Sequence, residues 1–228
     1  MTCQELMKQL EAMGTAQNRK VYARHGAKPP LFGVSYANLY RLQKQIKRDH
    51  SLAQELWNTG NSDARALATM IADPTQFDQK LATAWINGCD NYGLADHVAS
   101  VAAQSKHAQK LAEKWRTASS DWISQAGWGL TARLVKDPAI PDDYFAKLLP
   151  AIEAKIHSAK NRTRYAMNTA LIAIGCRPGL TDIALSAARR IGKVEVDHGE
   201  TGCKTPDAVT YLPKAAAYHA KRAARAKK

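Results

Sequence analysis

The sequence has few cysteines and no long apolar run. Its four cysteines, Cys3, Cys89, Cys176 and Cys203, are scattered over 228 residues, and none belongs to a C-x-x-C pair. This spacing does not fit a disulfide framework or a structural zinc site, and it is typical of free thiols in a reducing compartment. No run approaches the ~18 apolar residues that a membrane span needs, and no apolar signal segment opens the chain. We therefore expect a soluble, cytoplasmic protein that does not use a membrane.

Acidic residues are scarce relative to basic ones. Asp and Glu number 20 against 33 Lys and Arg, which gives a net charge of +13. Charge of this sign concentrates polyanions and is typical of nucleic-acid-binding proteins; the alternative is a basic protein whose charge serves only solubility. Six cations near the C-terminus have no acidic neighbour, and the rest of the chain keeps +7 without them: Lys214, Lys221, Arg222, Arg225, Lys227 and Lys228.

Strand signals are nearly absent, whereas helix signals recur throughout. Thr2 and Glu5 have the spacing of a capping box, and Ser35 is placed to cap a helix over residues 36–48. Gly26 is a candidate end for the second helix. Pro74 is expected to stop one helix and to begin the next in its first turn. The chain is therefore predicted to be all-α.

Three segments that end in proline share an internal spacing. In residues 64–74, 127–138 and 164–178, similar residues recur seven, four and three positions before the proline. Repeating helix pairs of ~30–45 residues are typical of HEAT-like solenoids. We predict a HEAT-like α-α superhelix of helical hairpins with a concave basic groove over residues 1–191; a plain helical bundle is the alternative. The recurring residues are Leu67, Met70, Ile71, Thr131, Leu134, Val135, Leu171, Ile174 and Gly175.

Residues 192–228 have a different composition. Residues 192–206 are polar and rich in glycine, which predicts a long loop. A final helix is expected to begin at Thr205 and Pro206, to be interrupted at Pro213, and to end in the basic tail, all packed on the same domain. Four side chains in this region could ligate an ion, but their spacing fits no familiar zinc pattern, so we expect no metal and no cofactor. They are Asp197, His198, Cys203 and Asp207.

Helical periodicity defines a second, non-core stripe on each of three predicted helices, over residues 91–103, 121–135 and 160–174. In a solenoid these stripes are expected to lie side by side and to line the groove. Aromatic rings beside cations suit unstacked bases and phosphates. The members of the stripes are Tyr92, Asp96, Ser100, Ala103, Trp122, Gln125, Trp128, Arg162, Tyr165 and Thr169.

Four segments, in this order, resemble the alkylpurine DNA glycosylases of the AlkD type, a family built from HEAT-like repeats. The resemblance extends from about Val21 to Arg190 and implies both the fold and a role in DNA alkylation repair. The segments are Phe32-Gly-Val-Ser35, Glu55-Leu-Trp57, Asp63-Ala-Arg65-Ala-Leu67 and Asn91-Tyr-Gly-Leu-Ala-Asp96.

The resemblance implies that Asp96 is the catalytic residue. Three other positions depart from the family pattern: Tyr92 and Thr169 stand where the family has tryptophans, and Gln125 stands where it has a DNA-contacting arginine. Taken together, the stripes and the resemblance assign DNA binding to Tyr92, Trp122, Gln125, Trp128, Arg162, Arg164, Tyr165 and Thr169.

The expected reaction is hydrolysis of the N-glycosidic bond of a purine alkylated at N3 or N7, in double-stranded DNA, by a monomer. Such a purine is already cationic and leaves readily, so one carboxylate that stabilises the developing oxocarbenium sugar and positions water is sufficient. The alternatives are a non-catalytic DNA- or RNA-binding protein of the same fold and, from a different class, a protein-binding scaffold.

Overall fold

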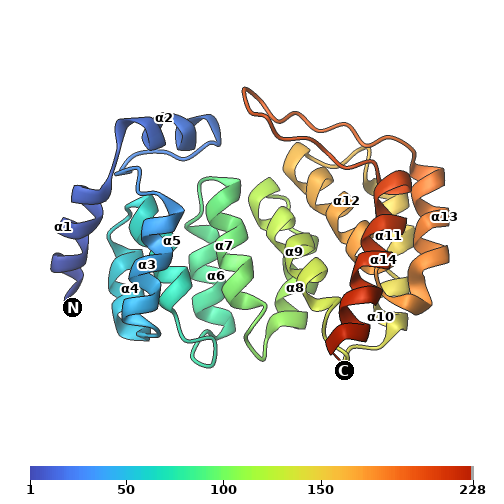
Figure 1. Cartoon of the computed structure of the whole chain (residues 1–228), viewed down its shortest axis with the longest axis horizontal. Helices are drawn as coiled ribbons and strands as arrows, with labels where there is room; N and C mark the ends of the chain where they lie inside the picture. Colours follow the sequence, from blue (N-terminus) through green and yellow to red (C-terminus); the bar gives the residue numbers. More distant parts are fainter. Residues whose placement is uncertain (227–228) are drawn as a thin grey trace. The chain divides into compact units, whose positions relative to one another are not determined.

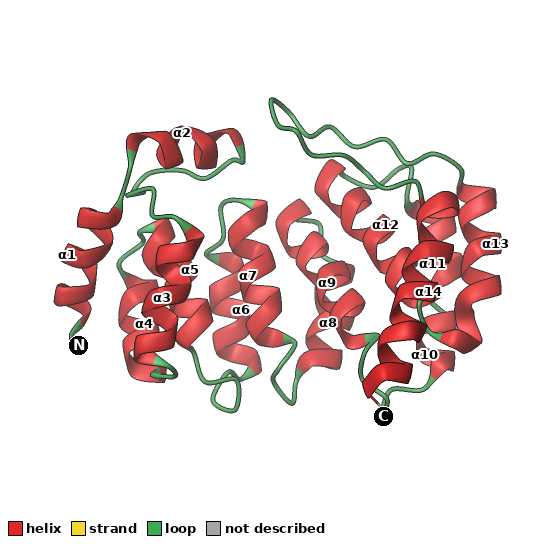
Figure 2. Cartoon of the chain, in the orientation of Figure 1, coloured by secondary structure: helices red, strands yellow, loops and turns green. Residues whose placement is uncertain are grey.

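The computed structural model describes residues 1–226, and the regular secondary structure of these residues is almost entirely α-helical (Figures 1 and 2). Within this range the only β-pairing is one antiparallel bridge between Gly14 and Val34. The all-α prediction is therefore confirmed. Lys227 and Lys228, two of the tail cations, lie outside the described residues. The helices are α1 (Cys3–Met13), α2 (Ala16–Arg24), α3 (Tyr36–Ile46), α4 (His50–Asn58), α5 (Ser62–Ile71), α6 (Gln79–Asn87), α7 (Tyr92–Ala102), α8 (Ala108–Arg116), α9 (Asp121–Leu134), α10 (Asp142–Ala146), α11 (Leu149–Lys155), α12 (Asn161–Gly175), the 3₁₀ helix η1 (Pro178–Leu180), α13 (Thr181–Ile191) and α14 (Ala208–Ala226).

The capping signals in the sequence set several helix ends. Thr2 Oγ1 accepts a hydrogen bond from the amide of Glu5 (3.2 Å), and the Glu5 carboxylate accepts one from the amide of Thr2 (2.8 Å). The hydroxyl of Ser35 accepts from the amide of Asn38 and caps α3. Gly26 follows α2 with a φ of +86°, the left-handed conformation that glycine adopts most readily.

The chain divides into two units. The N-terminal unit comprises Met1–Leu111 together with Gly199–Thr201, and the C-terminal unit comprises Ala112–His198 and the chain from Gly202 onward. In the N-terminal unit, α5 packs against α3, α4 and α7. Its buried face carries Ala64, Ala66, Leu67, Ala68 and Ile71, and the small alanines let neighbouring helices approach closely. The rings of Trp57 and Trp85 stack 4.3 Å apart and join α4 to α6.

In the C-terminal unit, α12 packs against α9, α13 and α14. A Cβ atom at Gly127 of α9 would lie 2.3 Å from the amide nitrogen of Arg116, so α9 passes the end of α8 at a distance that only glycine permits. The Asp121 carboxylate, at the start of α9, accepts hydrogen bonds from the amides of Arg162 (3.1 Å) and Thr163 (2.8 Å). This acid therefore caps α12 and fixes how α12 lies against α9.

The proline-ended segments correspond to α5, α9 and α12, each of which ends before its proline. Leu67, Ile71, Leu134, Leu171 and Ile174 are buried, as the spacing predicts. The predicted loop over residues 192–206 is also present, and it is held by Asn161, whose side chain exchanges hydrogen bonds of 2.7 and 2.8 Å with the backbone of Asp197.

Two predictions about proline are wrong. Pro74 does not begin the next helix, because Asp73 accepts hydrogen bonds from the amide and hydroxyl of Thr75 and forms a turn; α6 instead begins at Gln79. Pro213 does not interrupt the last helix, because α14 continues through it from Ala208 to Ala226. Pro213 is the sixth residue of α14, so it has no N–H to donate to the carbonyl oxygen of Val209, and the helix continues without that one bond.

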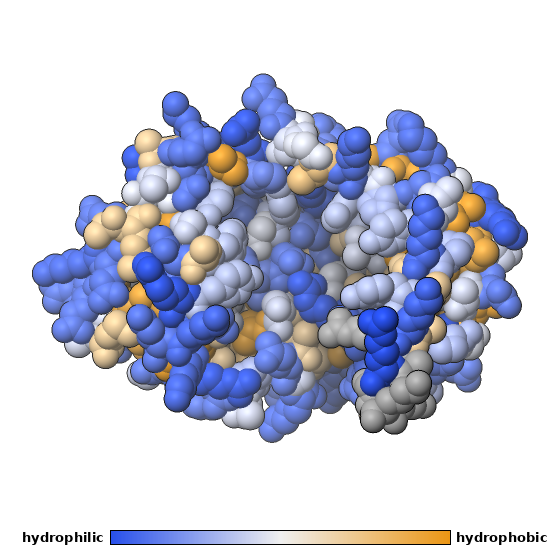
Figure 3. All heavy atoms as spheres, in the orientation of Figure 1, coloured by the Kyte–Doolittle hydropathy of each residue, from blue (hydrophilic) through white to orange (hydrophobic). Residues whose placement is uncertain are grey.

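The surface of the face drawn in Figure 3 is mainly hydrophilic, with apolar side chains in small separate patches. Within residues 1–226, no single helix is long and apolar enough to cross a membrane, and one sharply bent pair, 161–175 with 178–191, meets the length and composition test only when its two helices are taken together.

Candidate nucleic-acid interface

Asp96 is exposed to solvent on α7 of the N-terminal unit. Asn91 caps this helix, because its side-chain oxygen accepts a hydrogen bond from the amide of Leu94 (3.0 Å). Leu94, Ala95 and Val98 are buried on the opposite face of α7. Helical geometry therefore directs the Asp96 carboxylate outward, as the periodicity predicts.

Two tyrosine–histidine pairs fasten the first turns of α7 to earlier parts of the chain. The Tyr36 hydroxyl lies 2.8 Å from His97 Nε2, and the two rings stack with centroids 5.4 Å apart. A second hydrogen bond joins the Tyr92 hydroxyl to His25 Nδ1. Tyr92 and His97 flank Asp96 along α7, so both pairs fix the backbone that carries this carboxylate.

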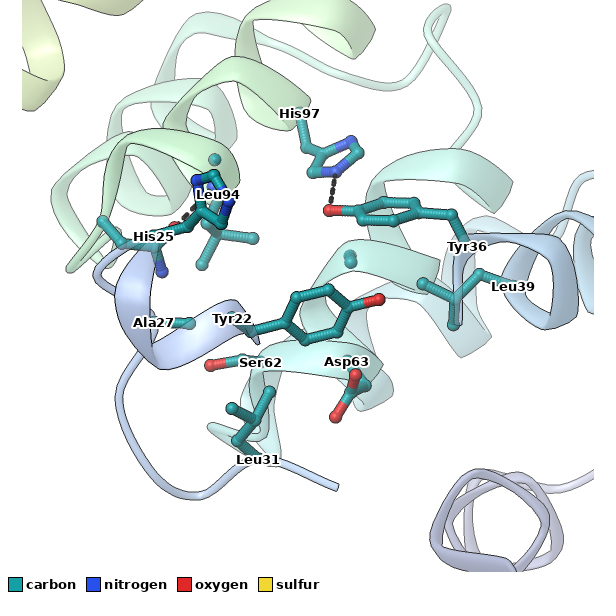
Figure 4. A pocket seen from close by; sticks show the side chains of 13 residues that line it. Tyr22, His25, Ala27, Leu31, Tyr36, Leu39, Ser62, Asp63, Leu94 and His97 are labelled. Atoms are coloured by element: carbon teal, nitrogen blue, oxygen red, sulfur yellow. Dashed lines mark hydrogen bonds between the residues drawn. The ribbon is translucent and has the colours of Figure 1, made fainter. Parts of the chain in front are cut away.

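A pocket of about 80 Å³ lies between these pairs in the N-terminal unit (Figure 4). Tyr22 and Tyr36 line it from α2 and α3, and their rings meet edge-on at 6.0 Å. In Figure 4, Asp63 and Ser62 lie at the end of α5 beneath these rings. Burial raises the pKa of the Tyr36 phenol to about 12, and the negative charge of Asp96 is one of the smaller contributions to this increase. The phenol therefore stays protonated across the neutral range, and its hydroxyl forms a hydrogen bond with the His97 ring.

Asp63 supports this pocket from within the protein. Its carboxylate accepts hydrogen bonds from the backbone amides of Phe32 (2.7 Å), Gly33 (3.0 Å) and Val34 (2.9 Å). Only 3% of Asp63 is exposed, and this burial raises the pKa of its carboxyl, although the three amides oppose the increase. Asp63 thus holds the loop that joins α2 to α3 over the N-terminal end of α5.

Exposed aromatic side chains extend this site along α3. Tyr36 is 40% exposed and Tyr40 is 52% exposed, and their rings lie 6.4 Å apart. Together with His97 they form a surface, which we call the aromatic platform, of a kind on which unpaired bases stack.

The chain matches the sequence family described as DNA alkylation repair enzyme over residues 6–187. It belongs to this family. Two relatives of this chain are the uncharacterized proteins Lin0241 of Listeria innocua and Lmo0209 of Listeria monocytogenes. They are 28% and 27% identical over 221 residues, which span 94% of this chain and 97% of each relative.

A solved structure shares the fold of this repair-family protein with a TM-score of 0.87 and 32% sequence identity, over 94% of this chain and 93% of the other. It is described as "a new family of proteins related to the HEAT-like repeat DNA glycosylases with affinity for branched DNA structures". The HEAT-like repeat prediction is therefore confirmed.

Two residues of α9, Gln125 and Trp128, were predicted to face outward, and this prediction is wrong. Trp128 is 6% exposed and Gln125 is 8% exposed, and the Arg116 guanidinium lies 5.5 Å from the Trp128 ring centroid. The prediction assumed one buried face, whereas α9 is buried on most sides, with Ser124, Ala126 and Leu130 inside as well. Trp122, by contrast, is half-buried.

The predicted residues of α12 differ in what they offer to a ligand. The Arg164 guanidinium donates hydrogen bonds to the carbonyl oxygens of Glu195, His157 and Ala159, so it also holds the backbone around it. Arg162 and Tyr165 are half-buried, and Thr169 is exposed. The roles in DNA binding assigned to these residues stay predictions.

Sequence periodicity did not identify the aromatic platform. Tyr36 and Tyr40 are four residues apart on one helix, which is a detectable signal, but their partner His97 lies 61 residues beyond Tyr36.

Within residues 1–226, no group of three or more His, Cys, Asp or Glu side chains is arranged to hold a metal ion.

Proposed function

We propose that this protein binds branched or partly unpaired DNA through the aromatic platform and the exposed first turns of α7. The observation that carries this proposal is the fold shared, at 32% identity, with a protein described as having affinity for branched DNA structures. The net charge of +13 supports it, because counterion release makes a basic surface favourable for any DNA.

Branched DNA differs from a continuous duplex in exposing unstacked bases at the junction. An exposed pair of tyrosines can stack on such bases without reading their sequence, at ~1–3 kcal/mol per base. Tyr36 is already held in place by its hydrogen bond to His97. Binding of DNA would therefore cost little additional side-chain entropy.

A second candidate function is hydrolysis of the N-glycosidic bond of N3- or N7-alkylated purines in double-stranded DNA, with Asp96 as the catalytic carboxylate. The observation that favours it is the exposure of Asp96 on α7 between the two tyrosine–histidine pairs. There a carboxylate could stabilise an oxocarbenium sugar and position water. Burial of Gln125 and Trp128 removes two side chains that were expected to face the DNA, and we therefore rank binding first.

One experiment compares the two functions directly. The wild type and Asp96→Asn are tested for affinity to a four-way junction and to a duplex of the same sequence, and for release of methylated base from methylated duplex. The binding function predicts at least about tenfold tighter binding to the junction, equivalent to ~1.4 kcal/mol, in both proteins.

The glycosylase function predicts base release by the wild type and none by Asp96→Asn. Equal affinity for junction and duplex would contradict the preference for branched DNA. Absence of base release from wild-type protein that binds DNA would contradict the glycosylase function.

A further inference from the structure

Helix α3 carries two kinds of exposed side chain in one line. Tyr36, Tyr40 and Lys44 follow one another at intervals of four residues, and Lys47 continues the line three residues later; all four are exposed. Leu39 and Leu42 are buried on the opposite side. The spacing of 3.6 residues per turn places Tyr36, Tyr40 and Lys44 on one face of α3. Lys47 follows as the residue that ends the helix, so the line is aromatic at its N-terminal end and cationic at its C-terminal end.

The cationic end of this line borders a pocket of about 380 Å³. The pocket lies at the C-terminal ends of α3 and α5 and is lined by Lys44, Lys47 and Arg48 without any carboxylate. Among residues 1–226, no hydrogen bond or ion pair occupies these three side chains. Gln43, whose Nε2 donates to the Met70 carbonyl at 3.2 Å, joins the two helices on one side of the pocket.

The carboxylates that follow the two helix ends accept hydrogen bonds from other groups. Asp49 accepts from the amide of Leu52 (3.0 Å), and Asp73 accepts from the amide of Thr75 (2.9 Å). Arg48 makes only a minor contribution to the lowered pKa of Asp73, which depends mainly on the Thr75 amide. The three cations therefore present positive charge that no local acid neutralises by contact.

The backbone at Lys47 is a second, independent observation. Lys47 has φ +65° and ψ −104°, and it is the only residue other than glycine with a positive φ among residues 1–226. Glycine adopts such a conformation with far less strain than lysine. Strain of this kind persists mainly where the surrounding structure or a function requires it. A cation near the C-terminus of α3 stabilises the helix dipole, but Lys44 already lies in the last turn and provides that charge. The dipole alone therefore does not explain a strained lysine at position 47.

We propose that Lys44, Lys47 and Arg48 bind a backbone phosphate of the DNA whose unpaired bases stack on the aromatic platform. The proposal rests on the DNA-binding part of the proposed function and assigns it a second site. The eleven residues of α3, from Tyr36 to Ile46, correspond to ~16 Å along the helix. This is about five nucleotides at ~3.4 Å each, so one strand can reach both ends of α3.

The test measures how DNA affinity depends on salt. Binding of a labelled four-way junction is followed by fluorescence anisotropy between about 50 and 200 mM KCl for the wild type, Lys47→Gly, Lys44→Gln and Arg48→Gln. Lys8→Gln is the matched control, because Lys8 is an exposed lysine of the same unit outside the pocket. Removal of one cation that binds a phosphate should reduce the slope of log K against log[salt] by ~0.9.

We expect shallower slopes for the pocket variants and an unchanged slope for Lys8→Gln. Lys47→Gly should also have a Tm no lower than that of the wild type, because glycine relieves the positive φ. If Lys47→Gly binds DNA more weakly but is as stable as the wild type, Lys47 acts in DNA binding and not in maintaining the fold. Slopes for the pocket variants equal to that of the control would overturn the proposal.

A titration with inorganic pyrophosphate, followed by NMR at the amides of residues 44–48, separates failure of this site from failure of the proposed function. Saturable shifts that vanish in Lys47→Gly support the phosphate site even if the wild type binds no DNA, in which case only the DNA function fails. DNA binding without such shifts and without a change in slope refutes the phosphate site alone. Absence of both DNA binding and shifts refutes both.

Discussion

The hydroxyl of Tyr36 and Nε2 of His97 form a hydrogen bond of 2.8 Å, and the two rings lie stacked at an angle of 25°. This contact joins α3 to α7, two helices separated by 45 residues of chain. It also places an exposed aromatic ring beside the segment of α7 that carries Asp96. Together with the Tyr92–His25 hydrogen bond, this contact fixes the first turns of α7.

Removal of the two exposed rings should weaken binding of branched DNA. We expect the double variant Tyr36→Ala with Tyr40→Ala to bind a four-way junction at least about tenfold less tightly, since base–aromatic stacking contributes ~1–3 kcal/mol per base. Tyr36→Phe keeps the ring and should bind within about twofold of the wild type, a difference below ~0.5 kcal/mol. Anisotropy titrations measure both.

Tyr211 is a suitable control for the loss of exposed aromatic surface. It is 51% exposed on α14 in the C-terminal unit, and Tyr211→Ala should leave the affinity unchanged. Equal loss of affinity in Tyr211→Ala and in the double variant would show that the α3 rings have no special role.

The raised pKa of Tyr36 predicts a loss of stability at alkaline pH. An unfolded tyrosine loses its proton near pH 10, whereas the folded phenol, with a pKa of about 12, keeps it. The unfolded state therefore binds fewer protons between these values, and the free energy of unfolding falls as pH rises from about 10 to 12. Because 40% of Tyr36 is exposed, we expect ~1 kcal/mol rather than the ~2.7 kcal/mol that two full pKa units represent.

Urea denaturation of the wild type and Tyr36→Phe across this pH range measures the effect, because other titrating groups cancel in the difference. The wild type should lose more stability than the variant. Parallel curves would mean that the phenol titrates as it does in the unfolded chain.

Helix positions could be predicted from the sequence because their signals are local. The Thr2–Glu5 box and the Ser35 cap act over three residues, and the apolar spacing within α5, α9 and α12 reports burial directly. Pro74 misled the prediction because a nearby side chain, Asp73, formed a turn that competed with helix initiation.

The site could be predicted only in part, for a physical reason. Periodicity identifies an outward residue such as Asp96 when a helix buries one face, but α9 buries most of its circumference, and Trp128 is inside. The aromatic platform and the Asp63 contacts join segments that lie 29 to 61 residues apart in the sequence. A local sequence pattern cannot predict which of such distant segments come into contact.

Asp63 should be essential for the stability of the N-terminal unit. Asp63→Ala removes the acceptor of three backbone amides, and buried N–H groups without partners cost about 1–3 kcal/mol each. We expect a loss of at least ~3 kcal/mol in urea denaturation and faster hydrogen exchange at Phe32, Gly33 and Val34. Asp63→Asn keeps one acceptor oxygen and should lose less.

The exposed Asp182 of α13 is the control for Asp63. Asp182→Ala should change the free energy of unfolding by less than ~1 kcal/mol, since it removes only a favourable charge near a helix N-terminus. Similar losses in Asp63→Ala and Asp182→Ala would indicate that the three amides find other acceptors.

Gly127 should tolerate no side chain, although it lies inside a helix. Alanine ordinarily stabilises a helix interior by ~0.5–1 kcal/mol relative to glycine, but here the new Cβ would lie 2.3 Å from the amide nitrogen of Arg116 and 2.6 Å from the carbonyl carbon of Trp115. These are backbone atoms that cannot rotate away, so α9 and α8 must separate. We expect Gly127→Ala to lose ~1–3 kcal/mol in urea denaturation, as overpacked cores do. Gly202→Ala, where a Cβ meets nothing within 4 Å, should change stability by less than ~0.5 kcal/mol. A Gly127→Ala protein as stable as the wild type would mean that helix propensity outweighs this contact, and that α9 does not need its close approach to α8.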